Sequence, residues 1–100
     1  MKIAVASTDK DENSSISDRA GRAPYYLIFD ESGKVLESID NPFSFGGGGA
    51  GFSVAKMLAD KNVDMVIAGR FGPKMLEALK ERGLKIREMN GNVKEAVLNV

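Results

Sequence analysis

Short apolar segments alternate with polar ones along this chain, and that pattern predicts five β-strands. Residues 2–7 place Ile3 and Val5 on one face and Ala4 and Ala6 on the other, which is typical of a central strand covered on both faces. The remaining strands are expected at 25–29, 35–39, 63–68 and 84–87. Charged residues within the third and the last of these segments favour edge positions for them.

Three other segments carry apolar residues at helical spacing. The first covers 51–62 and presents Val54, Ala55, Leu58 and Ala59 as its inner face. The second begins with Pro73 at its first helical position and stops at Gly83. The third covers 93–98 and follows a cap within 90–92.

The predicted element order is βββαβαβα, which indicates an α/β protein. Because a strand–helix–strand unit crosses over right-handed and returns parallel, the strands at 63–68 and 84–87 are expected to be parallel to the first. The hairpin adds an antiparallel second strand and a third strand parallel to the first. We therefore expect a five-stranded mixed sheet of order 3-2-1-4-5 with helices on both faces, in one domain spanning 1–100.

A glycine-rich run precedes the first predicted helix. Glycine lets main chain approach a ligand closely, and the N–H groups at a helix start lack intrahelical acceptors, so the run predicts an anion site. A plain flexible connection is the alternative. In such a sheet the loops at the carboxyl ends of the strands meet at one edge. The predicted binding residues on these loops are Arg19, Gly21, Arg22, Phe45, Gly46, Gly47, Gly48, Gly49, Ala50, Gly51, Gly69, Arg70, Phe71 and Gly72.

Some of these residues have a purely structural alternative. Arg22 can hydrogen-bond loop carbonyls, and Arg19 and Arg70 can be solvated turn residues. At least one of Phe45, Phe52 and Phe71 is expected in the core. The methionines at 57, 65, 75 and 89 are expected to fill the core.

Composition narrows the chemistry. The chain has 14 basic and 14 acidic residues, no Cys and no His. Zero net charge argues against a nucleic-acid binder that uses a broad basic surface. Without Cys or His, structural zinc sites, thiolate-bound iron–sulfur centres and Cys/His nucleophilic catalysis are excluded. No apolar run approaches membrane-spanning length, so we expect a cytoplasmic protein with no membrane or nucleic-acid partner.

In order and spacing, several segments resemble the dinitrogenase iron–molybdenum cofactor biosynthesis family, the small NifX-like domains. The matching segments are Ile16-Ser17-Asp18, Gly21-Arg22-Ala23-Pro24-Tyr25-Tyr26, Asn41-Pro42, Gly47-Gly48-Gly49-Ala50-Gly51, Val63-Asp64-Met65-Val66-Ile67-Ala68-Gly69 and Gly72-Pro73. The resemblance implies a three-layer ribonuclease H-like fold. It also implies binding or carrying of molybdenum- or iron-containing sulfide clusters without turnover, alongside cofactor-assembly proteins.

The chain departs from the family pattern at two positions. Many relatives have His-Phe where this chain has Arg19-Ala20, and some have His where it has Phe45. Arginine does not ligate metal but pairs with an anionic sulfide cluster. The hypothesis is therefore non-covalent capture of a preassembled molybdenum, iron or copper sulfide cluster by backbone amides and arginines, with no metal bound directly by a side chain.

Three other functions remain open. A nuclease needs converging carboxylates, and the first strand has none. A phosphate or nucleotide binder would use the same glycines, but the run lacks the Gly-Lys-Ser/Thr of a P-loop. A protein-interaction module would use exposed strand edges, which also permit dimerisation. Since no catalytic constellation is recognisable, we expect a non-enzyme.

Overall fold

The computed structural model describes residues 1–44 and 50–100. The elements follow the predicted order. They are β1 (Lys2–Ser7), β2 (Tyr25–Asp30), β3 (Val35–Asp40), α1 (Ala50–Asp60), β4 (Met65–Ala68), α2 (Pro73–Glu81), β5 (Lys85–Glu88) and α3 (Val93–Leu98). Within the described residues no helix is long and apolar enough to cross a bilayer.

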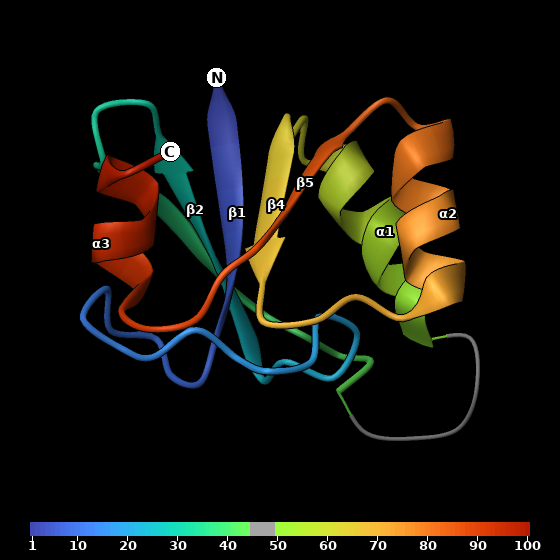
Figure 1. The fold of residues 1–100 in the computed structure, drawn as a ribbon, viewed down its shortest axis with the longest axis horizontal. Coiled ribbons are helices and arrows are strands. Elements are labelled where there is room, and N and C mark those ends of the chain that lie inside the picture. The colour runs from blue at the N-terminus through green and yellow to red at the C-terminus, as the bar shows by residue number, and fades with distance from the viewer. Residues whose placement is uncertain (45–49) are drawn as a thin grey trace.

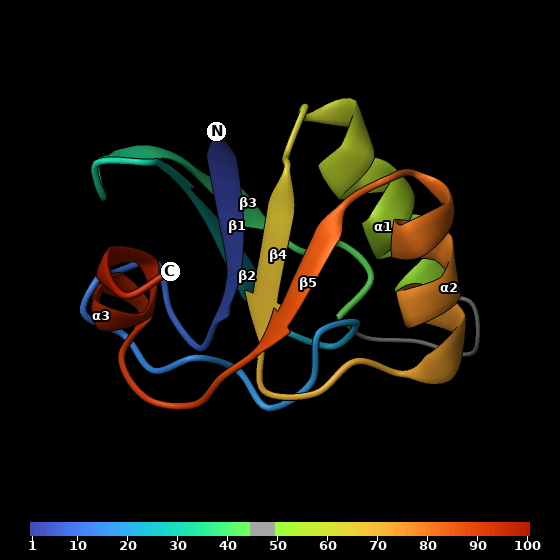
Figure 2. The same ribbon diagram turned by 45° about the horizontal axis from the view of Figure 1, so that its top comes forward.

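The sheet has the order β3-β2-β1-β4-β5, as predicted. β1 pairs antiparallel with β2 and parallel with β4, and β5 continues the sheet parallel to β4. β2 pairs antiparallel with β3. Figure 2 shows β1 and β4 running side by side in the same direction.

Helices cover both faces of the sheet, which makes three layers (Figure 1). Alternate residues of a strand point to opposite faces, so β1 contributes to two separate cores. Ala4 and Ala6 belong to the core under α1 and α2, and Ile3 and Val5 to the core under α3. The predicted division of β1 between two faces is confirmed. The short side chains of the alanines leave room for the larger residues of α1 and α2.

Several element ends differ from the predicted ones by one or two residues. Helix α1 ends at Asp60 rather than at 62 because Asn62 has a left-handed backbone, with φ 62°. Strand β4 begins at Met65 rather than at 63. The cap of α3 is confirmed, since the Asn92 side chain accepts a hydrogen bond from the Glu95 N–H at 3.1 Å.

One edge of the sheet gathers the segments predicted to form the site. The loops that follow β1 and β4 and the starts of α1 and α2 all lie along the lower edge in Figure 1. Backbone contacts join the loop after β1 to the loop after β4. The Gly69 N–H donates to the Ser17 carbonyl at 2.9 Å, and Arg19 forms an isolated β-bridge with Arg70. The long polar loop after β1 is therefore tied to the end of β4.

Candidate functional site

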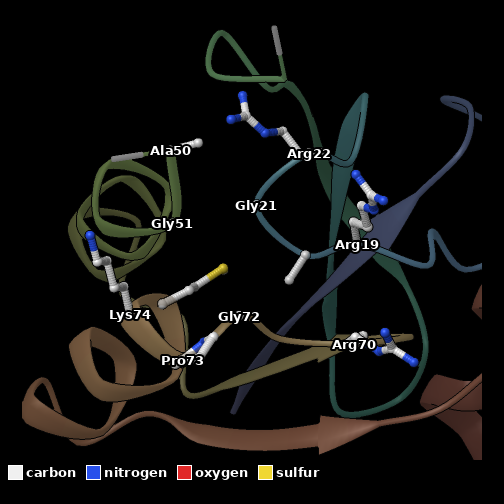
Figure 3. A pocket seen from close by; sticks show the side chains of 11 residues that line it. Arg19, Gly21, Arg22, Ala50, Gly51, Arg70, Gly72, Pro73 and Lys74 are labelled. Atoms are coloured by element: carbon white, nitrogen blue, oxygen red, sulfur yellow. The ribbon is translucent and has the colours of Figure 1, made fainter. Parts of the chain in front are cut away.

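A cavity of about 510 Å³ lies at this edge, between the loop after β1 and the starts of α1 and α2 (Figure 3). Its wall combines small residues, one methionine and four basic side chains. The lining residues are Arg19, Ala20, Gly21, Arg22, Ala50, Gly51, Arg70, Gly72, Pro73, Lys74 and Met75. The volume falls within the range of small-molecule sites, roughly 300–1,000 Å³.

Contact between α1 and α2 brings the two helix starts together. A Cβ atom at Gly51 would lie 2.8 Å from the Met75 Cβ and 3.2 Å from the Met75 backbone nitrogen, which leaves no space for a side chain. Only glycine allows this approach at the first turn of α1. The starts of both helices therefore form one continuous wall of the pocket.

Helix α2 begins without a side-chain cap. Gly72 is the N-cap, Pro73 is the first helical residue, and the first hydrogen bond runs from the Leu76 N–H to the Gly72 carbonyl at 2.9 Å. The N–H groups of Lys74 and Met75 therefore lack intrahelical acceptors. Neither α1 nor α2 has an acidic residue in its first turn, so the positive ends of both helix dipoles are not offset there.

The charges around the pocket have one sign. Arg19, Arg22, Arg70 and Lys74 line it, and none of its described lining residues is acidic. The ion pairs among the described residues all lie elsewhere. The side chains of Arg19, Arg70 and Lys74 thus have no hydrogen-bonding or ionic partner within the described part of the chain. Figure 3 shows Arg19 and Arg70 on one side of the pocket and Lys74 on the other.

Arg22 is held differently. Its Nη1 donates to the Phe43 carbonyl at 3.4 Å, so the structural interpretation of this residue, hydrogen bonding to a loop carbonyl, is confirmed. It nevertheless lines the pocket.

The structure brings seven of the predicted residues together in the pocket: Arg19, Gly21, Arg22, Ala50, Gly51, Arg70 and Gly72. Two others lie outside it. Gly69 lines a neighbouring polar cavity of about 410 Å³ that shares Arg19 and Arg70. Phe71 is 7 % exposed and packs in the core under α1 and α2. This confirms the expectation that at least one of Phe45, Phe52 and Phe71 is a core residue. The predicted residues Phe45, Gly46, Gly47, Gly48 and Gly49 lie outside the described residues.

Four lining residues were missed from the sequence: Ala20, Pro73, Lys74 and Met75. For Lys74 a signal was available, because it follows the proline that marks the start of α2. Met75 is a core residue, as predicted, yet it also forms part of the pocket wall. Among the described residues, no group of three acidic side chains is placed to hold a metal ion.

Comparison with known proteins gives consistent matches over all or nearly all of the chain. The sequence profile of the family described as "Dinitrogenase iron-molybdenum cofactor" matches residues 1–100. The apo form of the orange protein from Desulfovibrio gigas has a TM-score of 0.90 at 29 % identity, over 96 % of this chain and 82 % of that one. A "putative NifB protein" from Thermotoga has a TM-score of 0.80 at 39 % identity, over 96 % and 83 %. An uncharacterized protein of Methanocaldococcus jannaschii is 29 % identical over 93 residues, which are 90 % of this chain and 75 % of that protein.

Proposed function

The chain belongs to the dinitrogenase iron-molybdenum cofactor family, and from this membership we propose that it is a non-catalytic carrier of an anionic metal–sulfur cluster. The cargo would contain molybdenum or iron, with or without copper, and would arrive already assembled. The observation that supports this proposal most is the set of four basic side chains around a pocket whose described lining has no carboxylate.

Three of these cations are available to a ligand. Arg19, Arg70 and Lys74 have no partner within the described residues, so an anion would not have to displace an existing ion pair. A bound anion would also offset repulsion among the like charges that line the pocket. In Figure 3 the charged ends of Arg70 and Lys74 point away from the pocket, so both side chains would turn inward to meet the anion. The guanidinium groups would then donate hydrogen bonds to sulfide, and the Lys74 ammonium would act as a point charge.

The backbone would supply further donors. At the start of α2 the N–H groups of Lys74 and Met75 have no intrahelical acceptor, and the helix dipole favours negative charge there. These donors need no reorganisation when the anion binds. A cluster held by such contacts would not need a metal–side-chain bond, which suits a chain with no Cys and no His.

The wall between the charges favours a soft anion over phosphate. Gly21, Ala50, Gly51 and the Met75 side chain present mostly C–H and thioether groups. Burying a small, strongly hydrated oxyanion against such a surface costs more than burying a large sulfide cluster with the same charge spread over many atoms. Met75 also offers polarizable contact to sulfur.

Capture without turnover would place the protein in cofactor assembly or storage, with assembly proteins as donor and acceptor. A cytoplasmic location and the ribonuclease H-like description of the fold belong to this proposal too. The similarity to the orange protein, which was solved in an apo form, supports the proposed carrier role. The two proteins are 29 % identical over 96 % of this chain.

The direct test mixes the purified protein with tetrathiomolybdate, with and without copper, and records the absorbance spectrum after desalting. We expect a chromophore that stays with the protein. A colourless protein would contradict the proposal. A thermal-shift screen with phosphate and nucleotides runs in parallel, and stabilisation by those ligands alone would favour the phosphate-binding alternative instead.

Charge variants make the test specific to the pocket. Replacing Arg70 and Lys74 together by Gln should weaken retention roughly tenfold or more, because two unpaired cations are removed. Lys80→Gln is the matched control, since Lys80 is exposed at the opposite end of α2. Equal retention by the double variant and the control would show that the chromophore binds elsewhere.

A further inference from the structure

Two side chains hold the loop at one wall of the pocket by its carbonyl groups. The Tyr26 hydroxyl donates to the Ala20 carbonyl. The Asn41 carboxamide donates to the Gly21 carbonyl at 3.3 Å and to the Ala23 carbonyl at 2.9 Å. Three carbonyls within four residues therefore depend on donors that come from β2 and from the residue after β3.

Both donors are buried and fixed. Tyr26 is 0 % exposed and Asn41 is 4 % exposed. Burial raises the pKa of the Tyr26 hydroxyl far above its ordinary value, so it stays a donor at every physiological pH. The Asn41 Oδ1 accepts from the Phe43 N–H at 3.0 Å, which sets the orientation of the carboxamide.

The direction of the Ala20 carbonyl determines where the Gly21 amide points, and the Asn41 hydrogen bonds fix the peptide planes that follow it. Every peptide bond among the described residues is trans, and a trans peptide holds its C=O and the following N–H in opposite directions. The Gly21 N–H therefore points away from Tyr26. It has no acceptor among the described residues, and Gly21 lines the pocket. The preceding N–H, that of Ala20, donates to the Arg70 carbonyl at 3.0 Å, so this stretch is fixed from both sides.

We propose that the Gly21 N–H is an anion-binding group of this pocket and that Tyr26 and Asn41 are the positioning residues that hold it toward the ligand. The inference rests on the proposed function and adds a third backbone donor to the two at the start of α2. A donor aimed in advance of binding strengthens the interaction because the loop does not have to reorganise. Glycine at this position also leaves the amide accessible to a bulky anion.

The test follows backbone amide signals of the 15N-labelled full chain while tetrathiomolybdate is added. We expect the Gly21 amide proton to move downfield together with that of Lys74. Tyr26→Phe and Asn41→Ala should each weaken binding roughly 3- to 10-fold and reduce the Gly21 shift while the Lys74 shift persists at saturation. Tyr25→Phe is the matched control, because the Tyr25 hydroxyl makes no hydrogen bond within the described residues.

Each result decides the proposal. Persistence of the Lys74 shift with loss of the Gly21 shift supports it, and Tyr26→Phe alone suffices if Asn41→Ala does not fold. A Gly21 amide that does not move while the wild-type protein retains the chromophore overturns the inference and leaves the proposed function standing. Parallel loss of both shifts in the variants shows a merely structural role and also overturns it. A wild-type protein that retains no chromophore overturns both.

Discussion

Gly51→Ala adds one methyl group where the starts of α1 and α2 are in contact. The new Cβ would lie 2.8 Å from the Met75 Cβ, 3.2 Å from its backbone nitrogen and 3.3 Å from its Cα. Two of these atoms belong to the backbone and the third is attached to it, so no side-chain rotation relieves the overlap. The start of α2 must therefore move, and the pocket wall moves with it.

The expected change in the free energy of unfolding of Gly51→Ala combines two opposing effects. Overpacking of this kind costs about 1–3 kcal/mol. Replacing glycine by alanine in a helix recovers about 0.5–1 kcal/mol through the lower entropy of the unfolded chain. Because the 2.8 Å contact is far too short for a real Cβ, the cost should lie in the upper half of that range, so the variant should be less stable by about 1–2.5 kcal/mol. This lowers the melting temperature by roughly 4–20 °C for a chain of this size. Retention of tetrathiomolybdate should weaken as well.

Urea denaturation of Gly51→Ala, with the midpoint and slope fitted together, measures this loss. Gly72→Ala is the matched control at the same pocket. Apart from its two neighbours in the chain, no described residue has an atom within 4 Å of a Cβ at Gly72, and its φ of −70° and ψ of 156° suit alanine. Its stability should change by less than about 1 kcal/mol, since the weaker capping by alanine is offset by the entropy gain. A Gly51→Ala protein as stable as wild type would refute the packing argument.

Three further changes test other parts of the structure. Gly69→Ala would place a Cβ 2.8 Å from the Asp18 Cα, so we expect a loss of about 1–3 kcal/mol by urea denaturation, and an unchanged midpoint would contradict the close contact. Retention of tetrathiomolybdate should fall steeply between about 0.05 and 0.5 M NaCl, and less steeply in Lys74→Gln, because salt screens exposed charges; equal slopes in equilibrium dialysis would argue against a role for this ammonium. The Ser32 hydroxyl and then the backbone hold the pKa of Asp30 below its ordinary value, so its contribution to stability is present at neutral pH and is lost as pH falls below about 4. Asp30→Asn should therefore narrow the difference in urea midpoint between pH 7 and pH 3. An identical difference in the wild type and the variant would contradict a stabilising role of the Asp30 carboxylate.

The architecture could be predicted because its determinants are local or topological. The double-sided apolar pattern of β1 requires cover on both faces, and right-handed crossovers leave few arrangements for β4 and β5. The edge at which Arg70 and Gly51 meet follows from the same rules, since loops at the carboxyl ends of parallel strands lie together. Element ends were less predictable, as the left-handed Asn62 shows.

The sequence by itself determined the order of strands and helices, the absence of thiol and imidazole ligands, and the edge of the sheet that carries the basic residues. Tertiary structure alone decided which atoms face the pocket. Phe71 is next to Arg70 in the chain yet lies in the core, whereas Lys74 and Met75 reach the wall because α2 packs against α1. The hydrogen bond from the Tyr26 hydroxyl to the Ala20 carbonyl likewise could not be predicted from the sequence. Periodicity reports which face of an element is apolar, but the direction of a single amide or side chain depends on contacts between segments far apart in the chain.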